Sequence, residues 1–287
     1  MSTAQRLPSL QQIVDDSGDR LYVVVEHGCE RLHAVADAMA DRRERMHLVA
    51  CAMADRRERL HDAVEDGRER LHDAVELLKP HLRGWLHAGT CPLAIVAGLV
   101  LVLMSPTTTA AVGSGVFAMS ATMLFGGSAL FHRVRWSPRG HDLMRRLDHA
   151  NIFLLIAGTH TAIAMLHLDG DSQRTMLWLV WGGALAGIVF RMLWLEAPRW
   201  VYVAVYFAQG AAALYWLGEF AQAAQSVVLV LILAGGGLYS LGGLVYALQR
   251  PNPLPRWFGF HEVFHTLTVV AFAAHYAGIS IATYSLA

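Results

Sequence analysis

Apolar residues follow two different patterns along the chain, and the pattern changes near residue 80. Before this point charge is dense and apolar residues recur at helical spacing, whereas after it long apolar stretches alternate with short polar loops. An apolar stretch of about 20 residues can cross a bilayer as a helix. The sequence therefore predicts a helical extension, residues 1–80, followed by an all-α transmembrane domain, residues 81–287.

Seven apolar stretches follow residue 80, most of them long enough to span a membrane as a helix. Small residues would allow neighbouring helices to pack closely at Gly182-Gly183 and Gly187 of the fourth stretch and at Gly235–Gly237 and Gly242-Gly243 of the sixth. We therefore expect a seven-transmembrane helix bundle. The stretches are residues 85–104, 110–132, 148–168, 175–194, 200–217, 226–248 and 258–283.

Basic residues in the loops predict the direction of threading. Five arginines lie between residues 133 and 146, after the second stretch, whereas the loops after the first, third and fifth stretches share one arginine. Cytoplasmic loops carry the excess of Lys and Arg. We therefore expect a multi-pass protein of the cell membrane, with the N-terminus in the cytoplasm and the C-terminus outside.

The extension contains a repeat that predicts a long amphipathic helix. The tetrapeptide Glu-Arg-Leu/Met-His occurs at residues 30–33, 44–47, 58–61 and 69–72. Two alternatives remain: a solvated, coiled-coil-like helix that could join copies of the chain into a homo-oligomer, or a helix that lies on the membrane surface. The repeated histidines stand about 21 Å apart at 1.5 Å per residue, too far to share one ion. A strict seven-residue register runs through Leu32, Met39, Met46, Met53 and Leu60.

Composition agrees with a membrane protein that carries a polar extension. Hydrophobic residues make up 55% of the chain and charged residues only 16%. The formal net charge is zero, so no nucleic-acid partner is expected.

Polar residues with metal-binding chemistry stand at one end of three predicted helices. Ser128 and His132 share a helical face at the end of the second stretch, and Asp148 opens the third. His261 and His265 open the last stretch, at a spacing that can chelate one ion. Seven crossings place all three positions on the same side of the membrane. Three imidazoles and a carboxylate suggest a Zn²⁺ site with an open position, although imidazole also suits iron, nickel or copper.

Three other polar residues near these stretches have less specific interpretations. His149 is either a hydrogen-bond partner that orients a metal ligand or a residue of the membrane interface. Glu262 is expected to point away from the two histidines beside it, and to be solvated or paired with an arginine. His275 lies about 15 Å beyond His265 along the helix, so we expect it to pack or hydrogen-bond within the bundle.

Three short motifs together resemble the progestin and adipoQ receptor family, in particular its bacterial branch, hemolysin III; the adiponectin receptors belong to the same family. The resemblance covers residues 82–287 and leaves the repeat outside. One departure is His160-Thr161-Ala162, where the bacterial pattern commonly has Tyr-Thr-Pro. Without the proline, the third helix is expected to be straighter. The motifs are Ser128-x-x-x-His132, Arg146-Leu-Asp148-His149 followed by Ile156-Ala-Gly158-Thr159, and His261-x-x-x-His265.

The resemblance implies a seven-helix bundle with a cytoplasmic N-terminus and a bound Zn²⁺. By position, the zinc ligands would be His132, His261 and His265. The resemblance also implies that Asp148 holds a zinc-bound water and that Ser128 lies near the metal.

The leading functional hypothesis is a zinc-dependent hydrolase of a lipid amide or ester, ceramide-like lipids being the substrates that the resemblance implies. Asp148 would be the general base, and Ser128 would hydrogen-bond the water or the oxyanion. One alternative is a pore-forming or hemolytic membrane protein in which zinc is structural. Another is a receptor-like membrane sensor with the N-terminal helix as its output.

Overall fold

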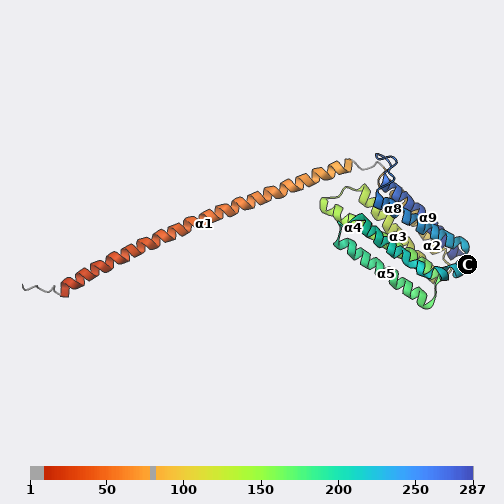
Figure 1. The fold of residues 1–287 in the computed structure, drawn as a ribbon, viewed down its shortest axis with the longest axis horizontal. Helices are drawn as coiled ribbons and strands as arrows, with labels where there is room; N and C mark the ends of the chain where they lie inside the picture. The colour runs from red at the N-terminus through yellow and green to blue at the C-terminus, as the bar shows by residue number, and fades with distance from the viewer. Residues whose placement is uncertain (1–9, 78–81, 287) are drawn as a thin grey trace, which may run out of the picture. The chain divides into compact units, whose positions relative to one another are not determined.

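The computed structural model describes residues 10–77 and 82–286, and within the first helix it describes the side chains of most residues from 28 to 67 (Figure 1). The chain divides into two units, residues 1–71 and 72–287. In the described residues every regular element is a helix, apart from one isolated β-bridge between Leu254 and Phe258. The predicted all-α class is confirmed for this part of the chain.

The first helix, α1, runs without a break through Leu10–Leu77 (Figure 1). Its 68 residues give a length of about 100 Å at 1.5 Å per residue. Ion pairs between residues four apart repeat along it, Asp41 with Arg45 and Asp55 with Arg59. An acid placed one turn before a base supports a helix locally. The side chains of the fourth repeat and the predicted boundary at residue 80 lie outside what is described.

The seven-residue register of α1 forms an exposed apolar stripe, which we call the α1 stripe. Other exposed apolar residues of the helix lie outside this register, at Val35, Leu48, Val49 and Val64. No packing partner for the stripe is seen among the described residues. Its members are between 60% and 70% exposed: Leu32, Met39, Met46, Met53 and Leu60.

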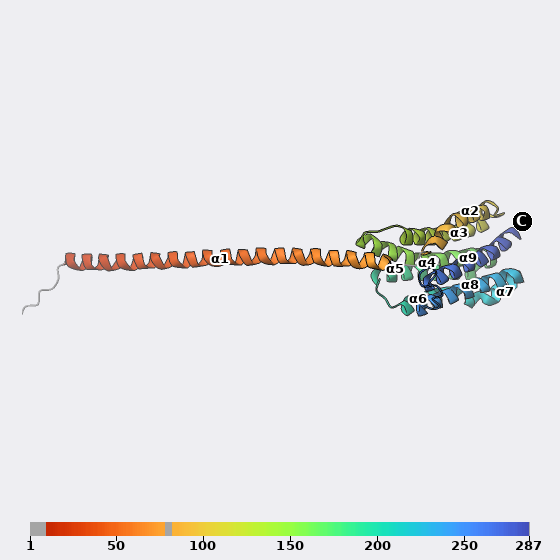
Figure 2. The ribbon, with the colours of Figure 1, turned by 90° about the horizontal axis from the view of Figure 1, so that it is seen from above.

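Seven helical segments of the second unit are long and apolar enough to cross a membrane, which confirms the predicted number. Six are single helices, whereas the fifth segment, Arg199–Ala223, is built from three consecutive helical pieces (Figure 2). The helices are α2 (Trp85–Leu103), α3 (Thr108–Arg133), α4 (Pro138–His167), α5 (Gly170–Leu193), α6 (Arg199–Ala211), η1 (Ala212–Trp216), α7 (Leu217–Ala223), α8 (Ser226–Leu248) and α9 (Phe260–Tyr284).

Helix α4 begins ten residues earlier than the apolar pattern predicts. The hydroxyl of Ser137 accepts a hydrogen bond from the backbone N–H of Gly140, and Pro138 occupies the first helical turn. Both features favour a helix start. Asp148 therefore lies nearly three turns inside the helix and does not open it.

The fifth segment changes from α-helix to 3₁₀-helix at Ala212. Just before this change the carbonyl oxygen of Gly210 lies 3.2 Å from Nε2 of His160. The other ring nitrogen of His160 lies 2.7 Å from the carbonyl oxygen of Ile156. His160, which departs from the bacterial hemolysin III pattern, thus links α4 to the irregular segment.

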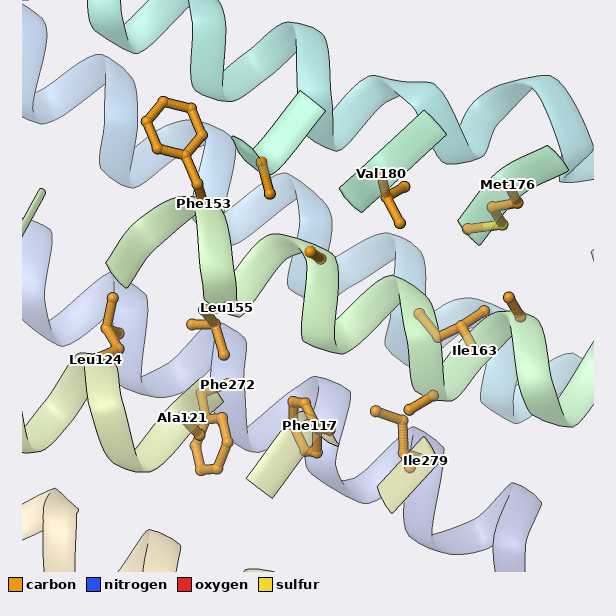
Figure 3. Packing of buried hydrophobic residues seen from close by; sticks show 14 of the residues in the cluster. Phe117, Ala121, Leu124, Phe153, Leu155, Ile163, Met176, Val180, Phe272 and Ile279 are labelled. Atoms are coloured by element: carbon orange, nitrogen blue, oxygen red, sulfur yellow. The ribbon is translucent and has the colours of Figure 1, made fainter. Parts of the chain in front are cut away.

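Helix α4 lies at the centre of the bundle, between α3, α5 and α9 (Figure 3). Its Phe153 and Ile163 are buried among side chains of the surrounding helices, including Phe117 of α3 and Val180 of α5. The continuous run of apolar and small residues in α4 explains this place, because a helix that is apolar all round is buried.

Two glycines allow close helix contacts in this core. A Cβ atom on Gly158 would lie 2.2 Å from Oγ of Ser120, and one on Gly187 would lie 2.3 Å from the ring of Phe153. Small residues at such points let helix backbones approach within a membrane. The prediction of close packing is thus correct for Gly187 in the fourth segment and for Gly235 and Gly243 in the sixth, whereas a Cβ atom on Gly182, Gly236 or Gly237 would meet nothing within 4 Å.

Candidate metal centre

Three histidines from two helices meet at one end of the bundle. His132 lies in the last turn of α3, and His261 and His265 lie in the first two turns of α9. Nε2 of His132 is 3.2 Å from Nε2 of His261. One ligand nitrogen from each ring lies within 4.8 Å of the others. The structure therefore brings together the three imidazoles that the sequence singled out.

This arrangement fits a divalent metal ion. Zinc–nitrogen bonds of 2.0–2.1 Å in a tetrahedral site put two ligand nitrogens about 3.3 Å apart, close to the separation of His132 and His261. Nδ1 of His265 is buried and has no hydrogen-bond partner among the described residues. The donor set is all imidazole, which suits zinc.

The first turn of α2 packs against the end of α3 and depends on a glycine. Gly84 has φ of 79°, and a Cβ atom there would lie 2.7 Å from Cβ of His132. Residues with a side chain rarely adopt this backbone conformation. Gly84 therefore lets α2 begin directly beside a metal-ligand candidate.

A buried ion pair joins the start of α2 to the start of α9. Nε of Arg83 lies 2.9 Å from Oε1 of Glu262, whose side chain is 1% exposed. The other carboxylate oxygen accepts a hydrogen bond from the backbone N–H of Gly259, which caps α9. The prediction that Glu262 is paired with an arginine is confirmed, whereas the alternative that it is solvated is wrong, since the residue is fully buried. This contact fixes the turn that carries His261 and His265.

His87 is a residue of this site that sequence reasoning missed. Its ring stacks on His265, with centroids 3.8 Å apart and planes at 15°. The residue is 3% exposed, and neither ring nitrogen has a hydrogen-bond partner among the described residues. The available signal was its place two residues inside the first apolar stretch, at the same end of the predicted bundle as the other histidines.

A cavity of about 500 Å³ runs from these histidines into the bundle. Ser128 and Asp148 line it beside His261 and His265, and apolar side chains from α4, α6 and α8 line most of the remainder. Among the described residues, the group close enough to share one ion comprises the three histidines without Asp148. Asp148 thus lines the cavity but lies outside the group of ligand atoms. This position suits a carboxylate that contacts a bound metal through a water molecule.

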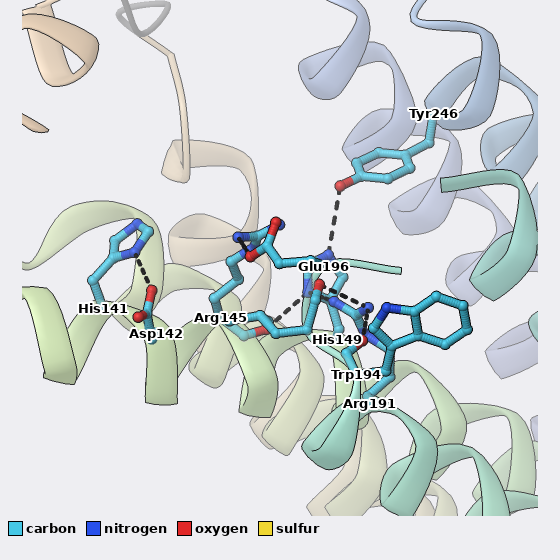
Figure 4. Close-up of polar contacts among 9 residues, drawn as sticks. His141, Asp142, Arg145, His149, Arg191, Trp194, Glu196 and Tyr246 are labelled. Carbon is cyan, nitrogen blue, oxygen red and sulfur yellow. Dashed lines mark hydrogen bonds and ion pairs between the residues drawn. The ribbon is translucent and has the colours of Figure 1, made fainter. Parts of the chain in front are cut away.

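His149, the neighbour of Asp148, lies in a separate polar network (Figure 4). Its Nδ1 is 2.8 Å from the carbonyl oxygen of Arg145, and its Nε2 is 3.5 Å from the hydroxyl of Tyr246. The buried guanidinium of Arg191 lies over the ring of Tyr202, 4.5 Å from its centroid, and donates to carbonyl oxygens after α5. The network ties α4, α5, α6 and α8 together. His149 is therefore buried within the bundle.

Comparison with known proteins shows a family profile and several relatives that match this chain. The profile described as "Haemolysin-III related" matches residues 75–276. Hemolysin-3 of Bacillus cereus is 29% identical over 161 residues, 55% of this chain and 73% of that protein. The Hemolysin-3 homolog of Bacillus subtilis (strain 168) is 29% identical over 135 residues, 47% of this chain and 63% of that protein. The Adiponectin receptor protein of Drosophila melanogaster is 29% identical over 187 residues, 58% of this chain and 41% of that protein.

Proposed function

Because the chain belongs to the haemolysin-III related family of membrane proteins, we propose that it is a zinc-dependent hydrolase of a membrane lipid. One observation carries the proposal: three imidazoles fit one metal ion, and two of them, His261 and His265, line the same cavity as Asp148 and Ser128. The bond cleaved is an amide or an ester. Ionisable groups inside a membrane protein are costly to place there and usually serve a function.

The three histidines would hold the ion and leave an open position, as in catalytic zinc sites. When bound, Zn²⁺ would supply an activated water and polarise the carbonyl group of the lipid. Asp148 lines the cavity and would serve as the general base, accepting a proton from the attacking water and passing it to the leaving group. Ser128, which is 2% exposed, donates a hydrogen bond to the carboxylate of Asp148 and would orient it toward the water.

The cavity indicates the class of substrate. Its walls between α4, α6 and α8 are largely apolar and suit a hydrocarbon chain. Ceramide-like amides are the first substrates to test, on the strength of the family resemblance. With the N-terminus in the cytoplasm, as the arginine-rich loops favour, the metal end of the cavity lies near the inner membrane face.

The variant Asp148→Asn tests the mechanism. We expect it to abolish turnover of a ceramide in detergent micelles while the protein still binds one metal ion, because Asp148 lies outside the group of ligand atoms. Asp142→Asn, the same change at a partly exposed position of α4, should leave both properties unchanged. Full activity in Asp148→Asn would remove Asp148 from the mechanism. Lysis of vesicles by wild type without any turnover would instead favour the pore-forming alternative with a structural metal.

The α1 stripe supports a second role, assembly with another copy of the chain. A row of exposed apolar residues at seven-residue spacing is the surface that coiled-coil helices bury against each other. Acidic and basic residues alternate beside the row, which suits a second copy better than an anionic lipid surface. In a membrane sensor this helix would couple the subunits.

A further inference from the structure

Two buried polar groups face each other in the half of the cavity away from the metal centre. They belong to His275 of α9 and Tyr239 of α8, which both line the cavity. The ring centroids are 5.4 Å apart. Neither Nδ1 of His275 nor the hydroxyl of Tyr239 has a hydrogen-bond partner among the described residues. Buried polar groups in folded proteins are nearly always paired, so this pair calls for a partner from outside the chain.

The hydrogen bonds of His275 fix which of its ring nitrogens can accept. Nε2 lies 2.9 Å from the carbonyl oxygen of Ile232, and a carbonyl oxygen can only accept, so Nε2 carries the proton. In the neutral imidazole Nδ1 is then an acceptor that lacks a donor. The position is built for this ring, because a Cβ atom on Gly235 would lie 2.2 Å from Cδ2 of His275.

Tyr239 provides the complementary group. Its phenol is a hydrogen-bond donor that lacks an acceptor in the described structure. A ligand group that donates to His275 and accepts from Tyr239 must do both at once, as an alcohol hydroxyl does. His160 at the same end is not available to a ligand, because both of its nitrogens already lie against backbone carbonyl oxygens.

The distance between the metal centre and His275 determines which part of a bound lipid would carry the hydroxyl group. His275 lies ten residues beyond His265 on α9, which is about 15 Å along the helix axis. A lipid whose carbonyl group is at the metal would reach this point with the middle of its hydrocarbon chain. The walls between the two ends are largely apolar and carry no competing charge.

We infer that His275 and Tyr239 form a subsite that selects lipids with a hydroxyl group on the hydrocarbon chain. The inference rests on the proposed role of the cavity in holding a lipid, and adds a substrate class to it. Hydroxylated acyl chains are preferred over plain ones because a plain chain leaves both polar groups buried and unpaired.

Equilibrium binding of two matched fatty acids to the detergent-purified protein tests the subsite without requiring turnover. Oleate and ricinoleate differ only by a mid-chain hydroxyl. We expect wild type to bind ricinoleate about tenfold more tightly than oleate. Tyr239→Phe should reduce this preference to about twofold or less while oleate affinity, which reports on folding, stays unchanged. Tyr276→Phe is the matched control, because that phenol donates to the carbonyl oxygen of Ala97 and does not line the cavity.

Each outcome separates the subsite from the proposed function. Equal binding of the two fatty acids by wild type, or the same preference in Tyr239→Phe, overturns the subsite and leaves the hydrolase proposal standing. A preference that Tyr239→Phe removes and Tyr276→Phe retains supports the subsite even if no lipid is hydrolysed. Binding of neither fatty acid overturns the subsite together with the lipid-binding role of the cavity.

Discussion

The ion pair between Arg83 and Glu262 should stabilise the bundle far more than a surface pair does. The side chain of Glu262 is 1% exposed and that of Arg83 is 20% exposed. In Arg83→Met the carboxylate of Glu262 would remain buried and keep only the N–H of Gly259. Breaking a buried pair in this way costs roughly 3–5 kcal/mol, and the partial exposure of Arg83 places our expectation at about 3 kcal/mol.

Reversible unfolding of the metal-free protein in detergent measures this loss. Arg174→Met is the matched control, because its pair with Asp171 is 73% and 93% exposed and should contribute less than about 1 kcal/mol. The double variant Arg83→Met with Glu262→Met should recover part of the loss, since no charge then remains buried.

The single variant Arg83→Met should also weaken metal binding. Glu262 lies between the two histidines of α9 and caps that helix, so its loss of partner loosens both ligands. Partners that orient metal ligands typically change the affinity about 10–100-fold. A loss of stability in Arg83→Met no larger than in Arg174→Met would refute the reasoning, because it would mean that water reaches the carboxylate.

Two further predictions concern α2 and α1. Gly84→Ala should lower the free energy of unfolding by about 1–2 kcal/mol or more and weaken metal binding, because φ is positive and Cβ would press on His132. The matched control is Gly89→Ala, which should be neutral or stabilising because a Cβ atom there would meet nothing within 4 Å. Metal titrations and unfolding curves of both glycine variants measure the difference. Met46→Asp with Met53→Asp should convert an oligomer of the full chain to monomers in light scattering, and leave metal content unchanged. An unchanged mass would exclude the α1 stripe as the contact.

The spans and the histidine cluster could be predicted because each depends on local pattern. Apolar length identifies a span, and the parity of crossings places His132 on the same side as His261 and His265. Neither inference needs knowledge of how the helices pack. The structure confirms both in the described residues.

The features that sequence reasoning missed depend on tertiary contacts. The start of α4 at Pro138 has a local signal in Ser137, but the polar residues that follow it masked the helix. The burial of Glu262 depends on α2, which is distant in sequence, and the stacking of His87 on His265 depends on the same approach. Gly84 gives no sign in the sequence that α3 ends beside it.

Metal content of the detergent-purified full chain, measured by plasma mass spectrometry, tests the central claim most directly. His265→Ala is measured beside wild type, with a folding check on both. The account predicts roughly one zinc ion per chain in wild type and its loss in the variant. Folded wild type without metal, or equal metal in both proteins, would contradict the proposed site and the hydrolase mechanism that depends on it.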